Sequence, residues 1–384
     1  MNYEEVYKSN KQQKLFGRYI SLQNIEPILH QLNTDNQLKT IGFSVQDKPI
    51  YSYTIGIGKT KILMWSQMHG NESTTTKAIF DFLNLMHSNS EIAIQFNKNF
   101  TFCIIPILNT DGAALYTREN ANQIDLNRDF KDLSQPESNL LMQVFDDFQP
   151  DFCYNMHDQR TIHGIESSKL PATVSFLAPS YNEACEYNEN RTKAAAIILE
   201  MNEMLQNFIP NQIGRFDDIF NINCAGETFQ SKGIPTILFE AGHFIGDLNR
   251  EITRKYIFFA IINSLFTIDK NVLKSCIVED YLLIPQNNAQ FFDFIYKNVR
   301  IVSNSQNILT TFAIQFIEQL TDGKILFNAR IEKIGDLENY FGHFEYDAHG
   351  LVFSDDFGNT PILESKANFK LGDNVLVING EIAS

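Results

Sequence analysis

The sequence has few cysteines, and their arrangement argues against two kinds of site. There are five, an odd number, and none forms a Cys-x-x-Cys pair: Cys103, Cys153, Cys185, Cys224 and Cys276. Such wide spacing argues against a disulfide scaffold and against a zinc site built from thiolates. We therefore expect reduced cysteines that pack in the interior.

Long apolar runs and basic clusters are also missing. No stretch approaches the roughly 18 uncharged apolar residues of a transmembrane helix, and residues 1–5 do not begin a secretory signal. We therefore predict a soluble, cytoplasmic protein with no membrane partner. The formal net charge of -15 and the lack of a Lys/Arg cluster argue against a nucleic-acid partner, because phosphate binding requires a basic face. No feature of the sequence indicates the oligomeric state.

Apolar residues are plentiful enough to form sizeable cores. Hydrophobic residues make up 43% and aromatic residues 12% of the 384 residues, a length typical of two or three domains. After two helices in residues 1–34 and a hairpin in residues 38–58, predicted strands alternate with predicted helices. The strands are 62–68, 100–108, 152–156 and 235–239, and the helices are 73–87, 137–148, 182–208 and 248–266. This alternation predicts an α/β fold, a mainly parallel mixed sheet flanked by helices, over residues 1–284.

The pattern changes near residue 285. One amphipathic helix is predicted over Asn287 to Val299, and short apolar segments follow, separated by Asp-Gly, Gly-Asp and Gly-Asn turns. These segments are 324–332, 342–353 and 375–378. We predict a small β-rich domain over residues 285–384, with a boundary placed to within about ten residues.

Polar residues follow the predicted strands of the first domain. His69 and Glu72 come after the first strand of the alternation, His157 after another and Glu240 after a third. The carboxyl ends of parallel strands are where such sheets bind ligands. A histidine and a glutamate three residues apart can hold two positions of a zinc ion, and a catalytic zinc needs a third ligand and an open position for water.

His157 is the natural third ligand. A single histidine after an apolar strand more often packs in the structure than binds metal, but two ligands at a neighbouring strand end reverse that preference. His163 is the alternative, although it lies in a predicted loop with less fixed geometry.

Several of these motifs together resemble the zinc carboxypeptidase family, which includes murein-peptide amidases and the succinylglutamate desuccinylase/aspartoacylase branch. The resemblance covers residues 55–245, approximately, and its motifs occur in the family's order. They are HGNE (69–72), NTDG (109–112), TREN (117–120), IDLNRDF (124–130), His157 and LFE (238–240).

The resemblance implies a zinc-dependent hydrolase in residues 1–284. By that resemblance, His69, Glu72 and His157 bind Zn²⁺, with water in the fourth position. The ion lowers the pKa of its water from 15.7 to about 7. Glu240 is the implied general base, which takes the proton of the water and passes it to the leaving amine. A structural salt bridge is the other reading of Glu240.

The resemblance also assigns roles to residues near position 125. Arg118 is expected to polarise the scissile carbonyl and stabilise its oxyanion. Asn127 and Arg128 are expected to bind the free carboxylate of the substrate, since a guanidinium offers two parallel donors. Asp125 resembles the carboxylate that orients the first zinc histidine, His69. Taken alone, this segment could be a polar turn.

The sequence departs from the family at one position. Peptidases of the family usually carry a mobile tyrosine upstream of the catalytic glutamate, but this chain has no tyrosine between Tyr187 and Glu240. Glu227 falls near the usual specificity pocket, where it would favour a basic or diaminopimelate-like side chain, or else it lies on the surface. His243 could contact the base or substrate, or only begin a loop.

Three functions remain as hypotheses. The first is hydrolysis of a peptide amide next to a free carboxylate, as in metallocarboxypeptidases. The second is deacylation of an N-acyl amino acid, whose family branch carries a small β domain after the catalytic one. The third is a binding protein that has kept the fold and lost turnover. Because all three ligands and the base are present in the sequence, we favour an enzyme.

Overall fold

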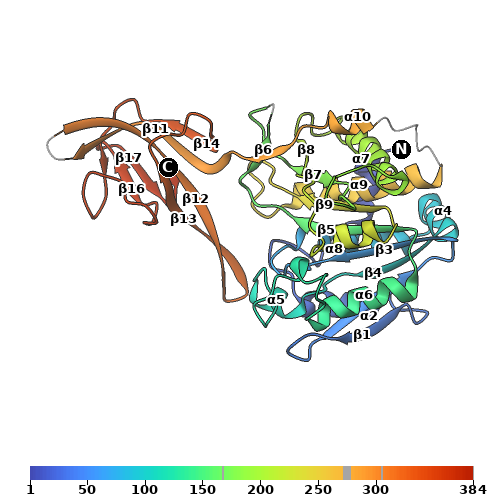
Figure 1. The fold of residues 1–384 in the computed structure, drawn as a ribbon. Coiled ribbons are helices and arrows are strands. Elements are labelled where there is room, and N and C mark those ends of the chain that lie inside the picture. The colour runs from blue at the N-terminus through green and yellow to red at the C-terminus, as the bar shows by residue number, and fades with distance from the viewer. Residues whose placement is uncertain (167, 271–277, 304–305, 384) are drawn as a thin grey trace. The chain divides into compact units, whose positions relative to one another are not determined.

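An eight-stranded mixed sheet is the centre of the larger part of the chain (Figure 1). The computed structural model describes residues 1–166, 168–270, 278–303 and 306–383. Within it the chain divides into two compact units. The first comprises Met1–Gln159 and Ile165–Asn287, and the second comprises Arg160–Gly164 and Asn288–Ser384.

The sheet of the first unit has a parallel centre. Its strand order is β1-β2-β4-β3-β5-β9-β7-β8. The pairs β4/β3, β3/β5, β5/β9 and β7/β8 are parallel, whereas β1/β2, β2/β4 and β7/β9 are antiparallel. The strands are β1 Leu38–Phe43, β2 Pro49–Ile55, β3 Thr60–Ser66, β4 Phe100–Ile105, β5 Phe152–Asp158, β7 Val174–Leu177, β8 Ile213–Arg215 and β9 Thr236–Ala241. The predicted α/β fold with a mixed sheet is therefore confirmed.

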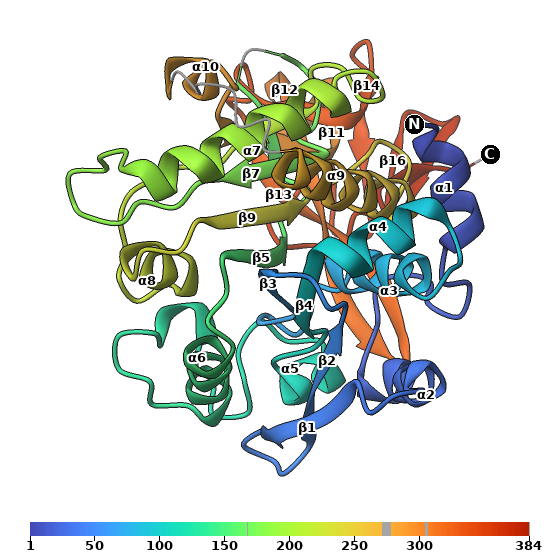
Figure 2. The ribbon, with the colours of Figure 1, turned by 90° about the vertical axis from the view of Figure 1, so that its right-hand side faces the viewer.

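Helices cover both faces of this sheet, as Figure 2 shows. Along β3, Ile62 and Met64 join a core with α3 and α9, while Leu63 and Trp65 join a second core with α6 and α8. A strand buried on both faces must be apolar throughout, which explains the uninterrupted apolar run. The helices are α1 Tyr3–Asn10, α2 Leu22–Leu32, α3 Thr74–Met86, α4 Glu91–Asn99, α5 Thr110–Leu115, the 3-10 helix η1 Leu126–Arg128, α6 Pro136–Phe148, α7 Glu189–Leu205, α8 Ala225–Ser231, α9 Glu251–Asp269 and α10 Val278–Leu282.

Helix α7 begins later than the sequence predicts. Its first residue is Glu189, not Asn182, and the side chain of Asn188 caps it by accepting the backbone N–H of Arg191. Upstream, Cys185 adopts a left-handed backbone conformation with φ of 53°. The buried Arg191 side chain then donates to the carbonyl oxygens of Cys185 and Glu186, so that these groups are satisfied without a helix.

The second unit is built from β-sheets. One sheet has the order β13-β12-β11-β14 and another the order β15-β16-β17-β18, and β6 and β10 form a separate two-stranded sheet. The strands are β6 His163–Ile165, β10 Asn287–Ala289, β11 Phe291–Ser303, β12 Gln306–Thr321, β13 Lys324–Ile334, β14 Phe341–Asp347, β15 Phe353–Ser354, β16 Phe369–Leu371, β17 Val375–Ile378 and β18 Glu381–Ile382. The prediction of β-rich structure in this part of the chain is confirmed.

The helix predicted from Asn287 to Val299 is wrong, because this segment forms β10 and most of β11. Phe294 and Tyr296 pack in one apolar cluster, and Ile295, between them, packs in another. β11 is thus covered on both faces. Its apolar residues therefore fall at helix-like intervals without forming a helix, and periodicity alone cannot separate the two cases.

Two expectations from composition can be compared with the structure. None of the helices within the described residues is long and apolar enough to cross a membrane. Cys103, Cys153 and Cys224 are free and buried, and Cys185 is free and partly exposed. Cys276 lies outside the described residues.

Candidate metal centre

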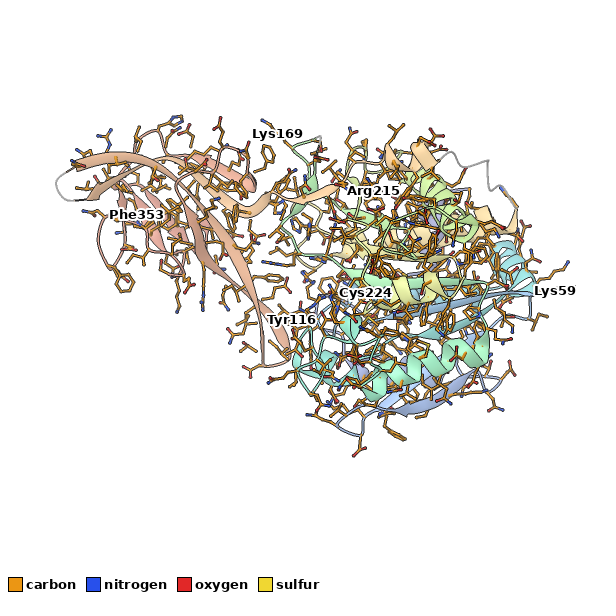
Figure 3. All side chains as sticks on the ribbon, viewed as in Figure 1. Lys59, Tyr116, Lys169, Arg215, Cys224 and Phe353 are labelled. Carbon is orange, nitrogen blue, oxygen red and sulfur yellow. The ribbon has the colours of Figure 1, made fainter. Side chains whose placement is uncertain are left out.

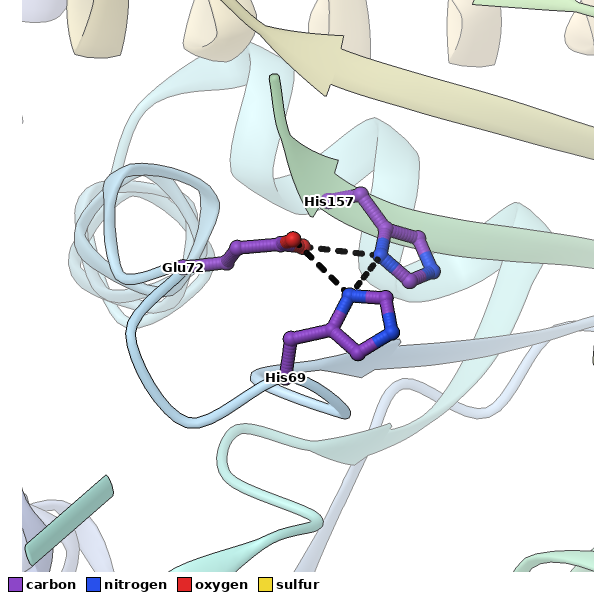
Figure 4. A group of neighbouring side chains, drawn as sticks. All are labelled: His69, Glu72 and His157. Carbon is purple, nitrogen blue, oxygen red and sulfur yellow. Dashed lines mark hydrogen bonds and ion pairs between the residues drawn. The ribbon is translucent and has the colours of Figure 1, made fainter. Parts of the chain in front are cut away.

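Three side chains of the first unit converge at the carboxyl ends of β3 and β5 (Figure 4). His69 and Glu72 lie on the turn between β3 and α3, and His157 lies near the end of β5. The Nδ1 atoms of His69 and His157 are each 2.8 Å from a different oxygen of Glu72 and 3.2 Å from one another. All three residues are buried. Strand order and turn geometry thus bring together the residues that the sequence separates.

Close backbone packing fixes the turn that carries the first two residues. A Cβ atom on Gly70 would lie 2.0 Å from the carbonyl carbon of Gly112 in α5, so only glycine fits there. The buried amide of Gln67 donates to the carbonyl oxygens of Gly70 and Ile20. The conformation of the turn is therefore fixed by Gly112 and Ile20, which are distant from the motif in the sequence.

Asp125 holds the ring of His69 from its other side. Its carboxylate lies 3.0 Å from Nε2 of His69 and also accepts the backbone N–H of Asn127 at the start of η1. Burial lowers the pKa of His69, but Glu72 and Asp125 together raise it above its ordinary value. Although burial opposes it, the bond to His69 and the nearby charges hold the pKa of Asp125 below its usual range.

The donor set suits a zinc ion. Two imidazole nitrogens and one carboxylate are the protein ligands of many catalytic zinc sites, which leave the fourth position to water. Their ligand atoms all lie within 4.8 Å of one another. The bond between Asp125 and Nε2 of His69 directs Nδ1 toward Glu72, as expected of an oriented metal ligand. These residues therefore fit the metal that the motifs imply.

Glu240 lies on the strand next to His157. β9 pairs with β5 in parallel, and Glu240 is in register with His157. Its Oε2 atom is buried and forms no hydrogen bond with any residue that the structure describes. Burial, followed by the charges of Glu72 and Asp158, raises the pKa of this carboxyl well above its usual range. A nearby dication would act in the opposite sense, since it favours the ionised carboxylate.

Arg118 reaches the same group of side chains. Its Nη1 atom lies 3.2 Å from Glu72 and its Nε atom 3.0 Å from Asp125. The side chain is 41% exposed. A fixed cation in this position can stabilise negative charge that develops on a substrate oxygen.

Asn127 and Arg128 lie on η1 and contact the start of α8. Asn127 Oδ1 accepts the backbone N–H of Ala225, and Arg128 Nη1 donates to the carbonyl oxygen of Asn127 and to Sγ of Cys224. Figure 3 labels Cys224, which directly precedes α8. The charge of Arg128 also helps to hold the pKa of Asp125 below its usual range, although these two side chains form no hydrogen bond with each other.

Three further residues named from the sequence have clear positions. The cluster found among the described residues contains His157 and not His163, which begins β6. Glu227 is half-buried on α8, and burial raises its pKa to about 7 against the opposing charge of Arg128. His243 is buried, and its backbone oxygen accepts the hydroxyl of Thr173.

Sequence reasoning missed the contacts of Asp158 and Cys224. Asp158 directly follows His157, and its backbone N–H donates to Glu72. Its position after a strand was a visible signal, but its partners are fixed only by the fold. No pattern in the sequence pairs Cys224 with Arg128.

Comparison with known proteins supports the resemblance drawn from the motifs. Residues 27–152 match the family model described as zinc carboxypeptidase. Carboxypeptidase SOL1 of Arabidopsis thaliana is 29% identical in a 126-residue alignment that covers 28% of this chain and 26% of that protein. The match thus spans about a quarter of the length of this curated relative. The match to the family model includes His69, Glu72 and Arg118, and it ends before His157.

Solved structures show the same fold. A metallo-carboxypeptidase from Burkholderia cenocepacia has a TM-score of 0.54 at 15% identity, over 66% of this chain and 70% of that chain. Carboxypeptidase A from Helicoverpa armigera has a TM-score of 0.52 at 15% identity, over 72% of this chain and 80% of that chain. At this identity the likeness concerns the fold alone.

Proposed function

We propose that this chain, which resembles the zinc carboxypeptidase family in its motifs and in its fold, is a zinc-dependent hydrolase. It would cleave an amide bond next to a free carboxylate, and the activity would reside in residues 1–284. The observation that carries the proposal is the convergence of His69, Glu72 and His157, with Asp125 behind the first histidine.

Bound zinc would supply a water molecule that is ionised near neutral pH and would polarise the scissile carbonyl. Glu240 would accept the proton of that water and deliver it to the leaving amine. Arg118 would stabilise the developing oxyanion, because it lies beside Glu72 and its side chain is 41% exposed.

The free carboxylate of the substrate would bind at η1. Within the described residues, Arg128 forms its hydrogen bonds through Nη1, so its remaining N–H groups face no protein acceptor. A guanidinium can bind a carboxylate through two parallel hydrogen bonds. Asn127, fixed by Ala225, would hold the loop in place for this contact.

The preferred substrate would carry a basic side chain. Glu227 is half-buried and near the charge of Arg128, and no side chain among the described residues forms a hydrogen bond or an ion pair with it. A metallo-carboxypeptidase from Pseudomonas aeruginosa of similar fold was solved with (2-guanidinoethylmercapto)succinic acid, a dicarboxylate with a guanidino group. A substrate with a cationic side chain near Glu227 would bind better than one with a neutral side chain, because the cation would stabilise the ionised carboxylate.

Deacylation of N-acyl amino acids is the second candidate function. The β-rich second unit favours it, because the deacylase branch of the resemblance also has a small β domain. Both activities would use the same metal ligands and the same base.

We also propose that this protein is located in the reducing cytoplasm, since the four described cysteines are free.

The first experiment is elemental analysis of the purified protein and of its His157→Ala variant. We expect close to one zinc per chain in the wild type and a large loss in the variant. Peptides, muropeptides and N-acyl amino acids, each with basic and neutral side chains, then separate peptidase from deacylase activity. A wild type that binds no zinc after reconstitution would support the binding-protein hypothesis instead.

A further inference from the structure

Helix α3 starts two residues after Glu72, and its first N–H groups are capped by Asp158, a residue at the end of strand β5. Ser73 occupies the N-cap position, yet its hydroxyl donates to the carbonyl oxygen of Arg18. The carboxylate of Asp158, at the end of β5, accepts the backbone N–H groups of Thr74 and Thr75 at 2.9 and 3.2 Å. A carboxylate at this end of a helix is favoured by the unpaired N–H groups and by the helix dipole.

Asp158 is therefore joined to both parts of the metal centre. Covalently it follows His157, and its own backbone N–H donates to Oε2 of Glu72 at 3.1 Å. Its side chain is 2% exposed, so water does not compete for these bonds. Two bonds from the carboxylate and one from the backbone thus fix the end of β5 against the segment that carries Glu72.

Arg250 extends this arrangement to the strand of the general base. Its Nη1 atom lies 3.7 Å from Asp158 Oδ2 and donates to the carbonyl oxygen of Ala241, which follows Glu240. Its Nη2 atom donates to the carbonyl oxygen of Gln159, which follows Asp158. The guanidinium therefore holds the ends of β5 and β9 together, next to the residues that follow Glu240 and Asp158.

We propose that Asp158 is a positioning residue for the metal ligands. By capping α3 from the end of β5, it sets the separation between Glu72 and His157, and Arg250 sets the separation between β5 and β9. This inference rests on the proposed zinc site. Groups that orient metal ligands typically change metal affinity by about 10- to 100-fold when they are removed.

The test is the zinc affinity of Asp158→Asn, measured by competition with a chelator. An amide can accept one N–H bond but lacks the charge that attracts Arg250 and the helix terminus. We expect the dissociation constant to rise by about 10-fold or more. The absorption spectrum of the Co²⁺-substituted protein should also change, because the ligand geometry would relax.

Asp129→Asn is the matched control. Asp129 is also buried, and it accepts the backbone N–H groups of Ser134 and Gln135 just before α6. Its loss should lower stability in the same way but leave the zinc affinity unchanged. Equal zinc affinity in the wild type and Asp158→Asn would overturn the inference and leave the proposed function intact. Wild-type protein that binds no zinc would overturn both.

A measurement on the wild type covers the case in which Asp158→Asn does not fold. Because coupling between two equilibria is reciprocal, zinc binding should slow hydrogen exchange at the Thr74 and Thr75 amides. The Ser134 and Gln135 amides should respond much less. Exchange at Thr74 and Thr75 that does not change on zinc addition would contradict the inference.

Discussion

Each histidine of the metal centre directs a defined nitrogen at Glu72. Both use Nδ1, and the Nε2 atom of His69 is committed to Asp125. In His69 the contact of Nε2 with Asp125 leaves Nδ1 for Glu72, since the partner of one ring nitrogen decides the role of the other. The three candidate ligands could be proposed from sequence, since His69 and Glu72 follow one apolar segment and His157 lies at the end of another. Asp158 could not, because its partners Thr74 and Thr75 belong to a distant helix.

The role of Glu240 is tested by replacing its carboxyl with an amide. Glu240→Gln should keep stoichiometric zinc but lose nearly all turnover, on the order of 100-fold or more, because only the proton transfer is removed. Metal content and kcat are measured on the same preparation. A variant that retains most of its activity would show that another group is the base.

The role of Arg128 is tested with paired substrates. Arg128→Ala should raise KM for substrates with a free carboxylate more than for the corresponding amides, since only the former can use the guanidinium. A difference of about 10-fold corresponds to roughly 1.4 kcal/mol of binding. The same change for both substrates would remove Arg128 from substrate binding.

At the level of elements, strands buried on both faces are hard to tell from helices by sequence, and the length of the strand decided which assignment failed. β3 and β11 are each packed on two sides, but β3 is short and lies between clear turns, whereas the longer β11 has apolar residues at helix-like intervals. The late start of α7 has a different cause, because the tertiary bonds of Arg191 hold Cys185 and Glu186 outside the helix. Neither effect is visible in local sequence.

A buried ion pair joins α3 to α9. Arg254 of α9 donates to both oxygens of Asp81 in α3, and its other N–H groups reach the carbonyl oxygens of Gln12 and Leu15. Asp81→Ala should lower the free energy of unfolding by about 3 kcal/mol, because Nε and Nη2 of the buried Arg254 would lose their carboxylate, although Glu251 would still pair with Nη1. Chemical denaturation measures this difference.

An exposed ion pair provides the comparison. Lys193 and Glu189 of α7 are 2.6 Å apart, with side chains 36% and 82% exposed. Lys193→Ala should change the free energy of unfolding by less than about 1 kcal/mol, since solvent screens exposed pairs. Similar losses in Lys193→Ala and Asp81→Ala would contradict the importance of the buried pair.

For the molecule as a whole, one histidine of the second unit makes stability depend on pH. His343 of β14 stacks on Phe291 and bonds to the carbonyl oxygen of Thr161. Burial lowers its pKa from 6.5 to about 4. The unfolded chain therefore binds a proton below pH 6.5 that the folded unit accepts only near pH 4.

The stability of the second unit should accordingly be complete above pH 6.5 and fall as the pH decreases toward 4. The loss is at most about 3.5 kcal/mol, since each pKa unit corresponds to about 1.4 kcal/mol. Denaturation of the full chain at several pH values, followed by a signal from the second unit, measures it. His343→Asn should flatten this dependence, whereas replacing His349, whose side chain is 85% exposed, should not.

The contact between Gly70 and Gly112 has a consequence for mutational scanning of this protein. A side chain at Gly70 would collide with the backbone of α5, although neither glycine can bind a metal through a side chain. A scan scored by activity alone would therefore rank Gly70 beside His69 and Glu72 and enlarge the apparent set of ligands. Scoring the same library for folded yield separates the two classes, because ligand substitutions spare the backbone and Gly70 substitutions do not.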